Sequence, residues 1–204
     1  MNTLSETFKV ILTADKESSR KAAREVRKLV YGSSSNDRYK EIISIIETAP
    51  AEYAKITDDF RQENFVIAVS VMYFLHNRDS HPDFLFPWLF ELLLHKNGNI
   101  RHAAVRMIEH EIGPLTYHLR FPGEVKNNRD LSSNAADYIL LQLFSRLNNL
   151  LHESWRPEYR KYKYIDSLPS GTYRSVQLIL SELEFDCGKQ YVAHMENVLK
   201  LFPR

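Results

Sequence analysis

The chain is predicted to be all-α and built from paired helices, and three observations support this. Apolar residues recur at three- and four-residue steps through most of the 204 residues, which is the spacing of an amphipathic helix. Only six glycines are present, and strand-like alternation is hard to find. Because 44% of the residues are hydrophobic, the chain can build a sizeable core, and we expect a single domain over residues 1–204.

The first two helix pairs are expected within residues 4–31 and 37–76. In residues 15–30 the predicted buried stripe is Ser19, Ala22, Ala23, Val26 and Val30. The next pair is Asp37 to Thr48 and Arg61 to His76, joined by a short segment that starts at Pro50, a favourable first helical position. The run FVIAVSVMYFL at 65–75 is β-branched, but its length and polar lead-in favour a buried helix.

A third pair is expected within residues 84–113. Its first helix carries the stripe Leu85, Trp88, Leu89, Leu92 and Leu93, and its second carries Ile100, Ala103, Ala104, Met107, Ile108 and Ile112. We expect Asn99 to cap the second helix and Gly113-Pro114 to end it.

Further helices are expected at 136–151, capped by Ser132 or Ser133, and at 172–183 and 190–201. The last two are separated by Asp186-Cys187-Gly188. Two stretches, 113–131 and 154–171, exceed ordinary loop length, and such loops are usually functional or flexible. The C-terminal third is therefore helical but irregular.

The first and third pairs show internal similarity. Residues 15–30 align with 96–111 at an offset of 81, which superimposes Arg20 on Arg101 and the Ala22-Ala23 pair on Ala103-Ala104. An offset of this size is two periods of about 40 residues, the length of a paired-helix repeat.

Residues 84–113, with a leucine-rich helix, a polar turn, the Ile100-Arg101 pair, two alanines and a Gly stop, resemble a HEAT repeat; residues 4–31 resemble it less closely. The resemblance implies a right-handed α-α superhelix of about four to five helical hairpins, with the second helices on the concave side. It also implies that Arg20 and Arg101 brace neighbouring repeats. Such solenoids serve mostly as binding scaffolds.

Composition places limits on partners and compartment. Lys and Arg total 27 against 26 Asp and Glu, so the net charge of +1 predicts neither a nucleic acid nor a membrane partner. The lone Cys187 excludes an internal disulfide and suits a reducing cytoplasm. The N-terminus lacks the pattern of a signal peptide, and the longest apolar run, 65–75, is shorter than the roughly 20 residues of a membrane span. We expect a cytoplasmic protein without membrane contact.

No catalytic residue, metal site or cofactor site is predicted from residue spacing. A zinc-protease motif starting at His110 would need a second histidine where Pro114 stands. Some HEAT-like hydroxylases hold two irons through His-Glu pairs from several repeats, whereas this chain has one such pair, His110-Glu111. The remaining histidines, including His118 and His194, show no ligand spacing, and exposed or capping roles fit them better. Asp186 would raise the pKa of the adjacent Cys187 thiol.

Charge clustering is the one positive functional signal. Residues 16–31 hold six basic residues against two acidic ones, and Arg20, Arg24 and Arg27 recur at helical spacing, with Lys28 alongside. A second basic segment at 156–174 interleaves tyrosines with cations, a pattern that suits phosphates and bases. The candidate ligand- or phosphate-binding residues are Arg20, Arg24, Arg27, Lys28, Arg106, Arg156, Arg160, Lys161, Lys163, Tyr162 and Tyr164.

These observations leave two functions open. The first is a non-catalytic protein-interaction scaffold with a concave binding surface and a protein partner. The alternative is a nucleic-acid-binding protein, resembling the HEAT-like alkylpurine DNA glycosylases. For that activity, an exposed aromatic residue and a carboxylate would have to meet on the concave side. Trp88 is expected in the core, Trp155 is the candidate for exposure, and no partner carboxylate follows from the sequence.

Overall fold

A computed structural model describes residues 3–31, 36–75, 85–123, 132–154, 170–187 and 189–201, and every element within these ranges is helical. In chain order the elements are α1 (Leu4–Thr13), α2 (Lys16–Tyr31), α3 (Asn36–Tyr53), α4 (Asp59–Met72), the 3-10 turn η1 (Tyr73–Leu75), α5 (Phe86–Leu93), α6 (Gly98–Arg120), α7 (Ser133–Ser154), α8 (Ser170–Cys187) and α9 (Lys189–Leu201). The all-α prediction is confirmed for these residues.

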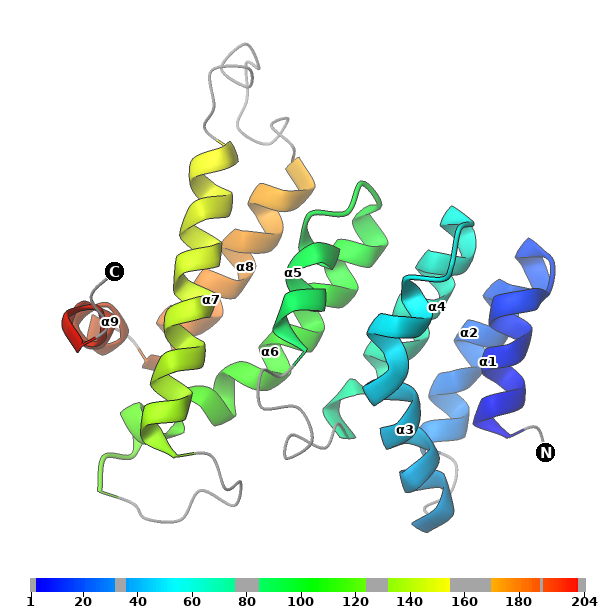
Figure 1. Ribbon diagram of the computed structural model, residues 1–204, viewed down its shortest axis with the longest axis horizontal. Helices are drawn as coiled ribbons and strands as arrows, with labels where there is room; N and C mark the ends of the chain where they lie inside the picture. Colours follow the sequence, from blue (N-terminus) through cyan, green and yellow to red (C-terminus); the bar gives the residue numbers. More distant parts are fainter. Residues whose placement is uncertain are drawn as a thin grey trace.

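The helices pack as successive pairs in two layers. Each of α1, α3, α5 and α7 packs on the helix that follows it, and α2, α4, α6 and α8 also contact one another in that order. Figure 1 shows the first helices of the pairs in front and the second helices behind, with the N-terminus and C-terminus at opposite ends of the row. α9 lies across the C-terminal end, against α7 and α8.

The predicted apolar stripes form the core. Ser19, Ala22, Ala23 and Val26 of α2 are buried, as are the stripes predicted in 85–93 and 100–112. Val30, the last residue predicted for the α2 stripe, is only half-buried against the core. The run at 65–75 is helical as expected, with Phe65 and Val69 fully enclosed. Close approach of α2 to its neighbours is possible because its buried stripe consists of small residues.

Polar side chains tie the pairs together at a few buried or half-buried points. Ser19 Oγ donates to the carbonyl of Ile11 at 2.8 Å and accepts from Asn64 Nδ2 at 2.9 Å, linking α1, α2 and α4. The two oxygens of Glu63 accept from Asn97 Nδ2 at 2.6 Å and Asn99 Nδ2 at 2.7 Å. This carboxylate joins α4 to the N-cap and first turn of α6.

Two expectations, one about Pro50 and one about the cap of α6, are wrong. Pro50 lies inside α3, which continues to Tyr53, instead of starting a connecting segment. The N-cap of α6 is Asn97, whose side chain accepts from Asn99 N at 2.8 Å, whereas Asn99 itself is engaged with Glu63. Asn97 takes the cap because its extended backbone positions the side-chain oxygen over the first turn.

The largest error concerns Gly113-Pro114, which does not end α6. The helix runs through both residues to Arg120 and changes direction in its last turns (Figure 1). Proline removes one backbone hydrogen bond and crowds the preceding turn, at a cost of about 3 kcal/mol. Leu115 and Thr116 beyond it are fully buried, and Arg120 Nη2 donates to the carbonyl of Gly113 at 2.7 Å. Burial and this side-chain donor offset the cost.

The C-terminal helices extend beyond their predicted limits. Ser132 caps α7 by accepting from Ala135 N at 3.2 Å, as expected, but α8 continues through Asp186 to Cys187. The first part of the predicted irregular stretch 113–131, residues 113–120, is helical. Most of the rest of that stretch and of 154–171 lies outside the described residues. Within the described ranges, every helix falls short of the combination of length and apolar character needed to cross a membrane.

Candidate functional site

The basic residues predicted on α2 share one exposed face. Arg20, Arg24 and Arg27 are all exposed and recur at i, i+4 and i+7. Lys28 is also exposed, but its Nζ lies 2.9 Å from Glu25 Oε1, so part of its charge is compensated. The three arginines therefore form a basic stripe along α2, as the sequence predicted.

An aromatic row crosses the second-helix layer at the end of this stripe. Tyr31, one turn after Arg27, stacks on Phe74 at 6.0 Å between ring centroids, and Phe74 contacts the ring of His110 at 6.2 Å. Arg106 is exposed one turn before His110 on α6. Because Arg27 and Arg106 are each one turn from a ring in this row, they flank it from α2 and α6.

The charge of the same layer changes sign towards α8. Burial raises the pKa of Glu109 on α6, and the negative charge of Glu182 on α8 raises it further. A bound polyanion that lay across α2 and α6 would meet these two carboxyl groups if it continued over α8. Glu109 and Glu182 therefore interrupt the basic surface between α6 and α8.

The other predicted cations and tyrosines, Arg156, Arg160, Lys161, Tyr162, Lys163 and Tyr164, lie outside the described residues, as does Trp155. Trp88 is buried, as expected, with its ring against that of Tyr53. Arg101 donates to the carbonyls of His95 and Lys96 at 2.5 and 2.9 Å, both in the turn of its own helix pair, so the bracing between neighbouring pairs expected for it is not what these contacts show. Arg20 is exposed on α2, so it does not brace neighbouring helix pairs among the described residues either.

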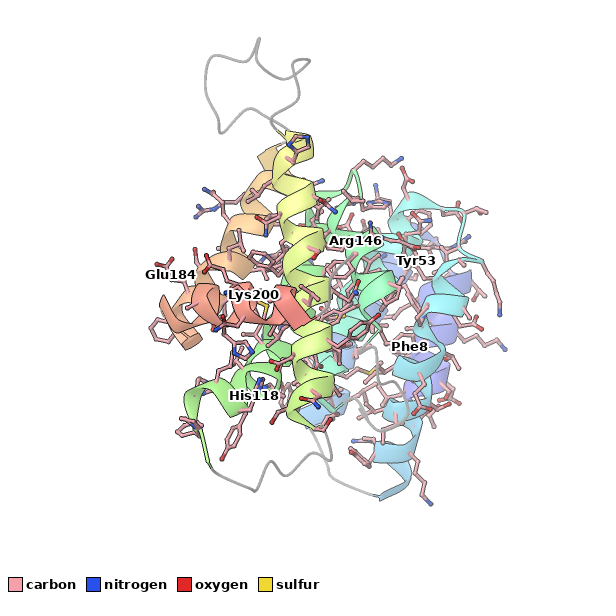
Figure 2. The ribbon with its side chains drawn as sticks, turned by 60° about the vertical axis from the view of Figure 1, so that its left-hand side comes forward. Phe8, Tyr53, His118, Arg146, Glu184 and Lys200 are labelled. Atoms are coloured by element: carbon pink, nitrogen blue, oxygen red, sulfur yellow. The ribbon has the colours of Figure 1, made fainter. Side chains whose placement is uncertain are left out.

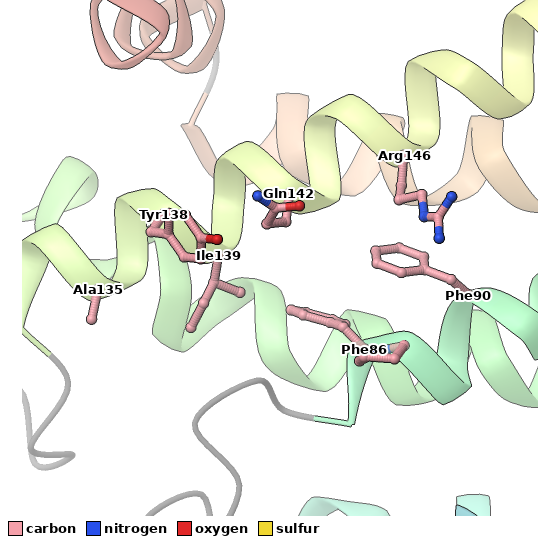
Figure 3. A pocket seen from close by; sticks show the side chains of 8 residues that line it. Phe86, Phe90, Ala135, Tyr138, Ile139, Gln142 and Arg146 are labelled. Atoms are coloured by element: carbon pink, nitrogen blue, oxygen red, sulfur yellow. The ribbon is translucent and has the colours of Figure 1, made fainter. Parts of the chain in front are cut away.

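An apolar pocket of about 450 Å³ separates α5 from α7 in the first-helix layer. Its walls are the rings of Phe86 and Phe90 on one side and Ile139 on the other (Figure 3). The remaining lining residues are Pro87, Ala135, Tyr138, Gln142 and Arg146. The pocket exists because α5 and α7 pack on α6 and α8 more closely than on each other.

The two ends of this pocket are polar. Arg146 is exposed at one end, with its guanidinium carbon 5.9 Å from the centroid of Phe90, and Tyr138 lies at the other end (Figure 3). Among the described residues no carboxylate pairs with Arg146. The pocket therefore offers an apolar interior together with a cation available to an incoming acidic group.

A cluster of two histidines and one aspartate joins three helices at the C-terminal end of the row. Asp137 Oδ1 lies 2.7 Å from Nε2 of His118 and 2.5 Å from Nε2 of His194. The two imidazole rings are 5.6 Å apart at an angle of 73°. The three side chains are 19%, 16% and 26% exposed for His118, Asp137 and His194. Figure 2 shows His118 on the last turns of α6, close to α7 and α9.

Sequence spacing missed this cluster because its members are 19 and 57 residues from the shared aspartate. The incorrect end predicted for α6 is a second reason why the cluster was missed, because His118 reaches α7 only where the helix continues past Pro114. The exposed roles expected for His118 and His194 are not what the structure shows, because both are largely covered. In the described part of the chain, these three residues are the group whose donor atoms converge closely enough for a metal ion, all within 4.8 Å of one another.

Comparisons of the chain with protein-family models, with curated proteins and with solved structures gave no significant match.

Proposed function

We propose that this protein is a non-catalytic, HEAT-like scaffold of the cytoplasm that binds an amphipathic helix of a partner protein in the pocket between α5 and α7. The observation that carries the proposal is an open apolar pocket with the available cation Arg146 at its rim. The contacts of α2, α4, α6 and α8 in chain order are compatible with the stacking of pairs that a superhelical scaffold requires.

The shape of the pocket favours a helix over a small molecule. Its α7 residues run from Ala135 to Arg146, a distance of about 16 Å or three helical turns. A partner helix presents apolar side chains at i, i+3, i+4 and i+7, and such a row of side chains has the length of this pocket. The aromatic rings of Phe86 and Phe90 supply the wide apolar contact area that binding hot spots typically use.

Charge complementarity defines the partner further. An acidic residue at one end of the partner helix would pair with Arg146, while the interior receives uncharged apolar side chains. The sequence led us to expect the binding surface among the second helices. We place it among the first helices because the apolar pocket lies there.

Selection from a displayed library of helical peptides tests the proposal. Peptides that bind the wild-type chain should carry a leucine- or phenylalanine-rich face ending in Asp or Glu. Gln142→Trp fills the pocket and Arg146→Glu reverses the charge at its rim, so each should weaken binding of the selected peptides by about tenfold or more. Asn148→Trp and Asn148→Glu, on another exposed face of α7, are the matched controls and should bind normally.

Two outcomes would count against a peptide site. Peptides that bind the wild type and the Gln142→Trp variant equally would place the contact elsewhere. Displacement of an apolar fluorescent dye from the pocket by small molecules, with no peptide selected, would assign it to a small ligand instead.

Nucleic-acid binding is a second candidate, favoured by the basic stripe of α2 and the aromatic row beside it. Arginines can contact phosphates, while Tyr31, which is 65% exposed and stacked on Phe74, offers its outer ring face to a base. A mobility shift titrated with salt tests this, because release of counterions makes phosphate contacts weaken steeply as salt rises. Arg20, Arg24 and Arg27 changed together to Glu should abolish the shift, whereas Lys9→Glu with Lys40→Glu in the first-helix layer should not. Absence of a shift at low salt would eliminate this candidate.

A further inference from the structure

We propose that His118, Asp137 and His194 bind one zinc ion that ties α9 to α6 and α7. The proposal is independent of the peptide site, because Asp137 and the residues that line the pocket lie on different faces of α7. It rests on the convergence of two imidazole nitrogens and a carboxylate oxygen from three helices, within 4.8 Å of one another.

The donor set favours zinc among the divalent metals. Calcium and magnesium prefer oxygen ligands, whereas imidazole nitrogens with one carboxylate suit zinc and its transition-metal neighbours. Two neutral imidazoles and one carboxylate leave a net charge of about +1 on a bound Zn²⁺, and a water molecule would complete four-fold coordination.

Little movement is needed to admit the ion. Zinc–nitrogen and zinc–oxygen bonds of about 2.0–2.1 Å place neighbouring ligands of a tetrahedral site about 3.3 Å apart. Asp137 Oδ1 now lies 2.7 Å from His118 Nε2 and 2.5 Å from His194 Nε2, so each of these pairs has to separate by less than about 1 Å. The two imidazole nitrogens, within 4.8 Å of one another, have to approach by up to about 1.5 Å. Rotation of partly exposed side chains accommodates such a change without moving the helices.

The position of the cluster indicates what the ion would do. α9 packs against α7 and α8, and the ring of His194 extends its contacts to His118 on α6. A metal bond at this point would hold the terminal helix to both α6 and α7. Because the ligands are assembled only in the folded chain, zinc binding and docking of α9 would stabilise each other.

Zinc binding is measured on the full chain after the protein has been stripped with a chelator and dialysed. Calorimetric titration with Zn²⁺ should give one ion per chain. Changing an outer-shell partner of a metal ligand typically costs 10–100-fold in affinity, so removing a ligand should cost at least about 100-fold. His118→Gln, His194→Gln and Asp137→Asn should each show that loss, whereas His102→Gln, at an exposed position of α6, should not.

Hydrogen–deuterium exchange supplies a second readout that does not depend on the variants folding. Zinc added to the stripped wild-type chain should slow amide exchange in residues 189–201. Fewer than one zinc per chain, or equal affinity in the wild type and a folded His194→Gln variant, would overturn the site. Tighter binding of Fe²⁺ than of Zn²⁺ under anaerobic conditions would overturn the choice of metal, and zinc binding without slower exchange in α9 would overturn its role as a tie.

Discussion

The carboxylate of Asp137 lies 2.5 Å from Nε2 of His194, although the two residues are 57 positions apart. Its oxygen is also 2.7 Å from His118 Nε2, so one side chain near the start of α7 holds contacts to both α6 and α9. The terminal helix is thus attached through a polar cluster in addition to its apolar contacts, Met195 and Val198.

Asp137→Ala is expected to loosen α9 even when a chelator keeps the protein free of metal. The variant removes the acceptor shared by two imidazoles, a loss of roughly 1–3 kcal/mol for a covered hydrogen-bonding group. Amide exchange in 189–201 should accelerate while exchange in α1 and α2 stays constant. Glu196→Ala, at an exposed position of α9, is the control; equal exchange in both variants would contradict the role given to Asp137.

Ser19→Ala should lower the free energy of unfolding by about 1–3 kcal/mol, because Asn64 Nδ2 would be left buried without its 2.9 Å acceptor. Denaturant titration measures the change, with Ser44→Ala on the exposed face of α3 as the control. Replacing both partners, as Ser19→Ala with Asn64→Leu, should cost less than the sum of the single changes. A double variant that loses the full sum would show that the two side chains are not coupled.

Glu63→Ala should lower the free energy of unfolding by about 1–2 kcal/mol, because one carboxylate accepts from both Asn97 and Asn99. The loss should be concentrated at the start of α6, where amide exchange is expected to accelerate. Glu91→Ala, exposed on neighbouring α5, serves as the comparison. If the two variants unfold at the same denaturant concentration, the bridge contributes nothing measurable.

Glu109→Gln should stabilise the protein at pH 7 but not at pH 4. Burial and the charge of Glu182 raise the pKa of Glu109 in the folded state. A raised carboxyl pKa favours the protonated form, so its contribution is present below the unfolded pKa and is lost as pH rises through the folded pKa. The melting temperature of the glutamine variant should therefore exceed that of the wild type at pH 7, with the difference vanishing on acidification. A difference that grows towards pH 4 would show the opposite sign of shift.

Much of the architecture follows from sequence periodicity alone. Buried stripes such as Ser19 to Val26 and Ile100 to Ile112 were placed correctly because helical spacing is a local property. Helix ends were predicted less well, since they depend on tertiary contacts. Pro114 is a strong local stop signal, yet the burial of Leu115 and Thr116 carries α6 beyond it.

The candidate sites were predictable only where they lie on one helix. The arginine stripe of α2 could be read from spacing within 16–31, and the exposed positions agree with it. The pocket between α5 and α7 and the cluster around Asp137 each combine residues from helices that meet only after folding. No fixed spacing relates those residues, so the sequence held no signal for either site.

The location of peptide binding tests the proposed scaffold function most directly. Hydrogen–deuterium exchange would be compared for the chain alone and with a selected helical peptide at saturating concentration. We predict slower exchange in α5 and in the Ala135–Arg146 part of α7, with α2 and α4 unchanged. Slower exchange confined to the second-helix layer, or no change in α5 and α7, would contradict the account.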